Sequence, residues 1–144
     1  MRCISLLLLL YLLVPEASAQ QPAAPPAGPE PEFRFSIYFG GGSAWIDPWQ
    51  EKALIRFIED LGDTELYEIT IHSHTDPIGG AEYNQWLSGQ RSTATMYLLE
   101  QTGIPPENMF IRDFGLHNPL YDNSTAEGRR GNRRVDILLW RQVL

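Results

Sequence analysis

The sequence has one cysteine, few cations and only one long apolar run. Cys3 lies within the first few residues, so the rest of the chain can form no disulfide staple and no thiolate metal or redox site. Eleven Lys and Arg stand against eighteen Asp and Glu, which gives a formal net charge of -7 at pH 7. A negative surface repels phosphate backbones and so disfavours nucleic-acid binding. A length of 144 residues excludes a large multidomain enzyme.

The apolar run stands at the start of the chain and predicts a cleaved signal peptide over residues 1–19. Arg2 precedes the apolar stretch 4–14, and Ala17-Ser-Ala19 then matches the small-x-small pattern of signal-peptidase sites. At about 1.5 Å per residue, a helix over this stretch crosses only about half of the ~30 Å hydrocarbon core, which argues against the alternative of an uncleaved membrane anchor. No transmembrane segment is therefore expected in the mature chain.

Residues 20–32, QQPAAPPAGPEPE, are predicted to form an extended linker. They are rich in Pro, Ala and Gly and carry no large apolar residue, so they cannot bury enough surface to offset the entropy of ordering. Beyond them, the hydrophobic pattern predicts one folded domain over 33–144.

The periodicity of this domain alternates between that of strands and that of helices. Strands are expected over 33–39, 66–73, 109–114 and 135–140, and helices over 48–62, 81–102 and 124–132. The last strand is apolar enough for an interior position. Each crossover is long enough to join parallel neighbours, which implies a sheet with helices packed on it. Trp45, Trp49 and Trp86 are expected to lie in the core, with a partly exposed partner surface as the alternative.

The helix over 81–102 has an apolar face with a polar stripe at its margin. The apolar face holds Tyr83, Leu87, Ala94, Tyr97 and Leu98, and the stripe holds Asn84, Ser88, Arg91 and Thr95. At such a margin an arginine can bind a carboxylate through paired hydrogen bonds. The preceding loop can hold Asp76 close by, and an acid beside a base suits a zwitterionic ligand. The alternative, equally weighted, is that Asp76 caps a turn and Arg91 pairs with a carboxylate for structural reasons.

The segment His72-Ser-His74-Thr-Asp76, followed by Gly79-Gly80, suggests a remote alternative. Its H-x-H-x-D pattern is similar to the zinc ligands of metallo-β-lactamase-like hydrolases. Such a site needs further ligands from distant loops, yet only His117 and no mature cysteine remain. The simpler interpretation is a pair of partly exposed strand histidines, so neither a metal nor a cofactor is expected.

Several short motifs follow one another in a set order through the predicted domain. They are Phe35-Ser-Ile-Tyr-Phe39, Ser43-Ala-Trp-Ile-Asp-Pro48, His74-Thr-Asp76 with Gly79, Asn84, Leu87-Ser88 and Arg91, then Gly115, Asn118-Pro119 and Gly128-Arg129 with Asn132-Arg-Arg-Val135. Together they resemble the OmpA-like C-terminal domain family over about residues 33–140. The resemblance implies an α+β fold, a βαβαβ(α)β two-layer sandwich with helices packed on a mixed four-stranded sheet.

The resemblance also implies a non-catalytic module that binds the diaminopimelate residue of the peptidoglycan stem peptide. Asp76 would receive the ammonium group of this ligand, and Arg91 its carboxylate. Further contacts are implied for Asn84, Thr75 and Arg134, with Arg133 as the competitor of Arg134. Many members carry Asp where this chain has Gly40 to Gly42, which puts contacts from that loop in doubt. This departure favours the alternative of an assembly factor that keeps the fold and has lost ligand binding.

The expected location is the periplasm, in association with the cell wall or the outer membrane. Peptidoglycan is the expected partner, with an envelope protein complex or a second copy of the chain in a homodimer as further candidates. No nucleic-acid partner is expected.

Overall fold

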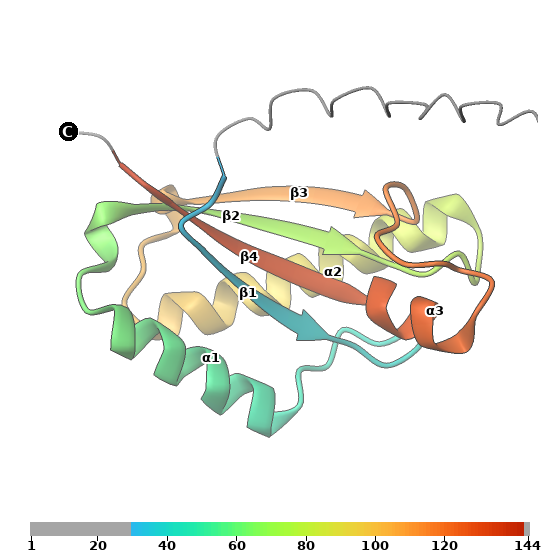
Figure 1. Cartoon of the computed structure of the whole chain (residues 1–144), viewed down its shortest axis with the longest axis horizontal. Coiled ribbons are helices and arrows are strands. Elements are labelled where there is room, and N and C mark those ends of the chain that lie inside the picture. Colours follow the sequence, from blue (N-terminus) through green and yellow to red (C-terminus); the bar gives the residue numbers. More distant parts are fainter. Residues whose placement is uncertain (1–29, 143–144) are drawn as a thin grey trace, which may run out of the picture.

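The computed structural model describes residues 30–142, in which strands and helices alternate along the chain (Figure 1). The main elements are β1 (Phe33–Tyr38), α1 (Pro48–Leu61), β2 (Tyr67–His74), α2 (Ala81–Gln101), β3 (Met109–Gly115), α3 (Ala126–Asn132) and β4 (Arg134–Arg141). Short 3-10 turns, η1 (Thr64–Leu66) and η2 (Pro106–Asn108), precede β2 and β3. Each predicted strand and helix is present, which confirms the α+β prediction. The predicted signal peptide and residues 20–29 of the predicted linker lie outside the described residues, so both stay predictions.

The four strands form one mixed sheet in the order β1-β4-β2-β3. β4 is antiparallel to both of its neighbours, and β2 is parallel to β3. The predicted interior position of the last strand is confirmed. The predicted mixed sheet is confirmed: the crossover between β2 and β3 joins parallel neighbours, whereas β4 lies between β1 and β2, and β3 and β4 are not neighbours. The residues Val135 to Leu139 of β4 are all buried, and the interior of a sheet is where a strand can be covered on both faces.

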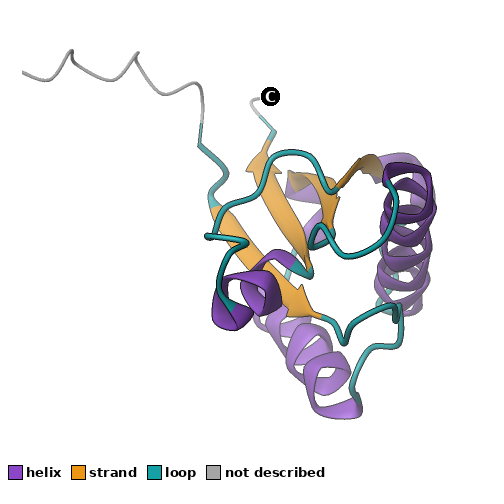
Figure 2. Cartoon of the chain, turned by 90° about the vertical axis from the view of Figure 1, so that its right-hand side faces the viewer, coloured by secondary structure: helices purple, strands orange, loops and turns teal. Residues whose placement is uncertain are grey.

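Helices α1 and α2 cover one face of the sheet (Figures 1 and 2). Leu54 and Ile58 from α1 meet Leu98 and Leu99 from α2 in a single apolar core. The strand residues beneath them are all 0% exposed: Ile37, Ile69, Ile71, Val135, Ile137 and Leu139. Within residues 30–142, no helix combines the length and the apolar character that a membrane span requires.

The ends of α1 follow from local sequence. Asp47 is the N-cap, and its carboxylate accepts a hydrogen bond from Trp49 N at 3.0 Å. Pro48 occupies the first turn, where no intrahelical donor is needed. Gly62 ends the helix with φ 74°, a conformation that favours glycine.

The prediction that the tryptophans lie in the core is wrong. Trp45, Trp49 and Trp86 are 65%, 69% and 57% exposed. The buried face of α1 runs through Gln50, Leu54 and Ile58, and Trp49, one position earlier, points about 100° away from it. Trp49 recurs at roughly helical spacing but lies beside the buried face of α1, so its place in the hydrophobic pattern does not predict its burial.

Candidate functional site

The face of α2 that packs on the sheet carries more polar residues than apolar ones, in contrast to the sequence prediction. Tyr83 and Tyr97, assigned to the apolar face, are 43% and 65% exposed. The stripe expected at the margin is instead the centre of the buried face, where its members are at most 1% exposed: Asn84, Ser88, Arg91 and Thr95. The predicted buried face of α2 is thus wrong, although Leu87 and Leu98 do lie in the interior.

Hydrogen bonds to the neighbouring strand explain why polar residues occupy this face. Ser92 Oγ donates to the Asp113 carboxylate at 2.5 Å, and Ser88 Oγ accepts from Gly115 N at 3.2 Å. Thr95 Oγ1 donates to Arg91 O within the helix. A buried hydroxyl with a partner carries no large desolvation penalty, so α2 can bury a polar stripe.

Arg91 is the most completely buried cation of the described residues, with 0% of its surface exposed. Its guanidinium donates to three backbone carbonyls: Nε to Ser43 O at 2.9 Å, Nη1 to His74 O at 2.8 Å, and Nη2 to Gly40 O at 3.1 Å. It also lies 4.9 Å from the centre of the Phe39 ring. Arg91 therefore ties the end of β2 and the loop after β1 to α2.

Burial lowers the pKa of Arg91 to about 10, a shift that the nearby Asp76 carboxylate opposes. The side chain remains protonated at neutral pH. Three hydrogen bonds occupy three of the five N–H groups of a guanidinium, so two remain for a further acceptor.

Asp76 stands at the end of β2 with both carboxylate oxygens in use. Oδ1 accepts from Ile78 N at 3.1 Å and closes the turn, as the structural alternative expected. Oδ2 accepts from Arg133 Nη1 at 3.0 Å in a largely buried ion pair. Arg133 also donates through Nε to Phe39 O at 3.0 Å, which fixes its guanidinium between β1 and Asp76.

These side chains line one cavity of about 260 Å³. Five of the six predicted site residues contribute to it: Thr75, Asp76, Asn84, Arg91 and Arg133. Two of them present buried polar atoms without a hydrogen-bond partner, Thr75 Oγ1 and Asn84 Oδ1. A buried acceptor or hydroxyl without a partner is costly, so these atoms indicate a place where a polar ligand can bind.

Arg134 is the predicted residue that the structure does not bring to this cavity. Its Nε donates to Asp136 Oδ2 at 3.0 Å, while its Nη1 is buried without a partner. Asp136 also accepts from Ser36 Oγ at 2.7 Å. The sequence contains a signal for this pairing of Arg134 with Asp136. Side chains alternate between the two faces of a strand, so residues 134 and 136 of β4 must share one face.

The loop after β1 contributes backbone and no side chain to the cavity. Gly41 and Gly42 line it, and Gly42 has φ 61° with Tyr83 Oη only 3.2 Å from where a Cβ would stand. Sequence reasoning missed the role of the Gly40 and Ser43 carbonyls as acceptors for Arg91. The run of glycines was the available signal, because close backbone approach favours glycine.

The three residues of the zinc alternative do not form a metal site. Among the described residues, no group of three His, Cys, Asp or Glu side chains is placed to hold a metal ion. His74 stacks on Phe114 with ring centres 4.9 Å apart, and Asp76 is engaged by Arg133. The interpretation of His74 as partly exposed is also wrong, since it is 3% exposed.

Burial lowers the pKa of His74 to about 4, and the adjacent Arg134 acts in the same direction. The Asp136 carboxylate, 4.0 Å from His74 Nε2, opposes this shift. The pKa of the half-buried His72 is lowered as well, first by desolvation and then by Arg112. Both imidazoles are therefore neutral at pH 7.

Comparison with known proteins points to one family. A model described as the OmpA family matches residues 38–133 of the chain. The outer-membrane lipoprotein YfiB of Pseudomonas aeruginosa is 30% identical over 103 residues, which cover 72% of this chain and 61% of YfiB. The peptidoglycan-binding protein ArfA of Mycobacterium tuberculosis is 31% identical over 133 residues, which cover 86% of this chain and 41% of ArfA. The chain thus spans less than two thirds of the length of either relative.

Solved structures agree with this result. The peptidoglycan-associated lipoprotein from Burkholderia pseudomallei superposes with a TM-score of 0.67 at 25% identity, covering 72% of this chain and 88% of that chain. The C-terminal domain of Helicobacter pylori MotB gives a TM-score of 0.68 at 22% identity, covering 76% of this chain and 86% of that chain. The second likeness concerns the fold alone.

Proposed function

The chain belongs to the OmpA family, and from that membership and the cavity around Asp76 we propose that it is a non-catalytic module that binds peptidoglycan without a covalent bond. The bound group is the diaminopimelate of the stem peptide. The module acts in the periplasm and links the envelope, or a complex within it, to the cell wall. Relatives named as outer-membrane and peptidoglycan-binding proteins support this location.

The chemistry of the cavity matches the free end of diaminopimelate, which carries an ammonium and a carboxylate on one carbon. Arg91 has two N–H groups left for the carboxylate. An ionised carboxylate offers about four lone-pair positions. Asp76 uses one for Ile78 N and one for Arg133, so it can also accept from the ammonium.

The two unpartnered oxygens are the observation that carries the proposal. Asn84 Oδ1 and Thr75 Oγ1 are buried at the wall of the cavity and make no hydrogen bond within the described part of the chain. An ammonium with three donors can satisfy Asn84 Oδ1 and Asp76 together, and the Thr75 hydroxyl can donate to a carboxylate. A ligand with both groups completes hydrogen bonding that the protein leaves open.

Asp76→Asn is expected to weaken binding of the sugar-free tripeptide L-Ala-D-Glu-diaminopimelate at least about thirtyfold, because it removes a charge-assisted contact to the ammonium. Calorimetric titration of the purified chain measures this. Asp60→Asn on the exposed surface of α1 is the matched control and should bind as the wild type does. Wild-type affinity in the Asp76→Asn protein would contradict the assignment.

The role of Arg91 is tested by changing the ligand and not the residue, because a substitution of Arg91 would also destabilise the fold. A tripeptide with lysine in place of diaminopimelate keeps the ammonium and lacks the carboxylate. We expect it to bind about tenfold or more weakly than the diaminopimelate peptide. Equal affinity for the two peptides would show that Arg91 does not receive the carboxylate.

Exposed aromatic rings support a second candidate function, that of a protein-interaction or assembly factor. Trp45, Trp49, Trp86 and Tyr97 are each more than half exposed, and tryptophan and tyrosine are enriched in protein interfaces. Absence of binding heat from a folded wild-type protein with the diaminopimelate peptide would favour this function.

A further inference from the structure

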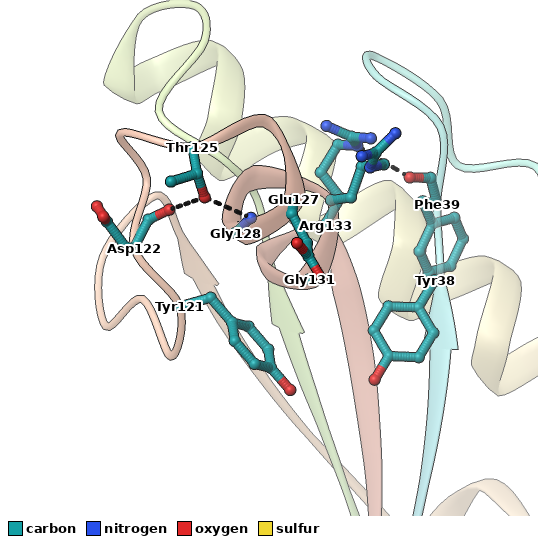
Figure 3. Close-up of a pocket in the computed structure, with 10 residues that line it drawn as sticks. Tyr38, Phe39, Tyr121, Asp122, Thr125, Glu127, Gly128, Gly131 and Arg133 are labelled. Atoms are coloured by element: carbon teal, nitrogen blue, oxygen red, sulfur yellow. Dashed lines mark hydrogen bonds between the residues drawn. The ribbon is translucent and has the colours of Figure 1, made fainter.

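A second cavity, of about 630 Å³, lies beside the first, between the end of β1, the segment before α3 and α3 itself (Figure 3). Its volume is in the range of small-molecule sites, about 300–1,000 Å³. Figure 3 shows the rings of Tyr38 and Tyr121 on its two sides, below α3. Both tyrosines are 45% exposed, and neither phenol has a hydrogen-bond partner among residues 30–142.

The backbone at each of these tyrosines is firmly held. Tyr121 N donates to Asn132 Oδ1 at 3.0 Å, and Asn132 Nδ2 donates back to Tyr121 O at 2.8 Å. The ring of Tyr121 lies so close to Gly131 that a Cβ there would stand 2.6 Å from it. Tyr38 N and O both bond the Gln50 amide, at 2.9 Å each. Two pre-positioned aromatic walls with free hydroxyl groups suit a ring that is itself part apolar and part polar.

Arg133 lines this cavity as well as the smaller one around Asp76. Its guanidinium bridges Phe39 O and Asp76 Oδ2, both at 3.0 Å. The two cavities therefore share one lining side chain, and a ligand that is held at Asp76 and extends past Arg133 would reach the tyrosine pair.

Charged groups of both signs line the second cavity, so they do not favour a strongly charged ligand. Among the described residues, Arg130 is the one arginine of the run 129–134 whose side chain makes no hydrogen bond. It is offset by Asp122 and Glu127, which line the same space. Hydroxyl and acetamido groups can exchange hydrogen bonds with such a mixed set, whereas a free ion would meet opposing charges.

We propose that the cavity between Tyr38 and Tyr121 receives an amino-sugar ring of the glycan strand from which the stem peptide extends. This inference rests on the proposed function, because it needs the diaminopimelate to be held at Asp76. The dipeptide L-Ala-D-Glu joins that residue to the sugar, and two extended residues span about 7 Å. Such a span can pass the Arg133 side chain and place the apolar face of the sugar against a tyrosine.

The test compares two ligands on the purified chain: the sugar-free tripeptide and the same tripeptide attached to its disaccharide. The wild type is expected to bind the disaccharide form about tenfold more tightly, in keeping with one favourable ring contact. Tyr121→Leu and Tyr38→Leu, each on an opposite wall, are expected to remove this gain while leaving the affinity for the sugar-free tripeptide unchanged. Tyr97→Leu, an exposed position on α2 that lines neither cavity, is the matched control and should keep the gain.

The outcomes separate this inference from the proposed function. Equal affinity of the wild type for the two ligands overturns the sugar site and leaves the diaminopimelate site standing. Failure of both ligands to bind overturns the proposed function and the sugar site with it. If the two tyrosine variants weaken both ligands to the same degree, the gain does not arise in this cavity and the inference is wrong.

Discussion

Arg91→Met is expected to lower the free energy of unfolding by roughly 3–5 kcal/mol, the range seen when one partner of a buried charged network is removed. Methionine fills much of the same space but leaves three carbonyl oxygens, of Gly40, Ser43 and His74, without their donor. Small domains are stable by only about 5–15 kcal/mol, so this loss is a large share of the total. Urea denaturation followed by circular dichroism measures it.

Two further variants make this prediction specific. Arg91→Lys keeps the charge but has a single compact ammonium that cannot reach all three carbonyls, so an intermediate loss is expected. Arg56→Met on the exposed side of α1 should change stability by about 0.5 kcal/mol or less. If the free energy of unfolding of Arg91→Met lies within about 0.5 kcal/mol of the wild-type value, the Arg91 guanidinium does not stabilise the fold.

The dual position of Arg91 explains how the site is built. Its three backbone bonds fix the loop after β1 against the end of β2, which is where Asp76 begins the next turn. The same guanidinium faces the cavity with its remaining donors. A residue that orders the walls of a site and also lines it is preorganised, so little entropy is lost when a ligand arrives.

The sequence was sufficient to predict the elements of the fold, because each boundary has a local cause. Asp47 and Gly62 mark α1 through capping chemistry that needs no tertiary information. The interior position of β4 follows from an apolar run that only two covered faces can satisfy. The strand order was not predictable in the same way, since placing β4 between β1 and β2 depends on pairing energies between distant segments.

The orientation of α2 shows where sequence periodicity stops being informative. Hydrophobicity favoured a face with Tyr83 and Tyr97, whereas the buried face is centred on Asn84, Ser88 and Arg91. These polar side chains can be buried because they have specific partners on other elements. A partner that is distant in sequence does not alter the hydrophobic periodicity of the helix, so the pattern cannot reveal it. Arg133 and Arg134 differ for a related reason, as adjacent residues before and within β4 point to different sides.

Acidification is expected to destabilise the protein before its carboxylates titrate, because His74 is buried in the neutral form. Burial and Arg134 hold its pKa at about 4, below the ordinary 6.5 that it regains on unfolding. Between these values the unfolded chain binds a proton that the folded chain does not, so stability rises with pH. From pH 7 to pH 5 the wild type should lose about 2 kcal/mol from this residue.

Urea denaturation at pH 7, 6 and 5 tests this, with His74→Gln as the informative variant. Glutamine cannot titrate, so most of the loss between pH 7 and pH 5 should disappear, and the part that remains reports on His72, whose pKa is lowered in the same direction. His117→Gln replaces an exposed histidine and should retain the wild-type profile. A His74→Gln protein that still loses about 2 kcal/mol over this interval would place the acid sensitivity elsewhere.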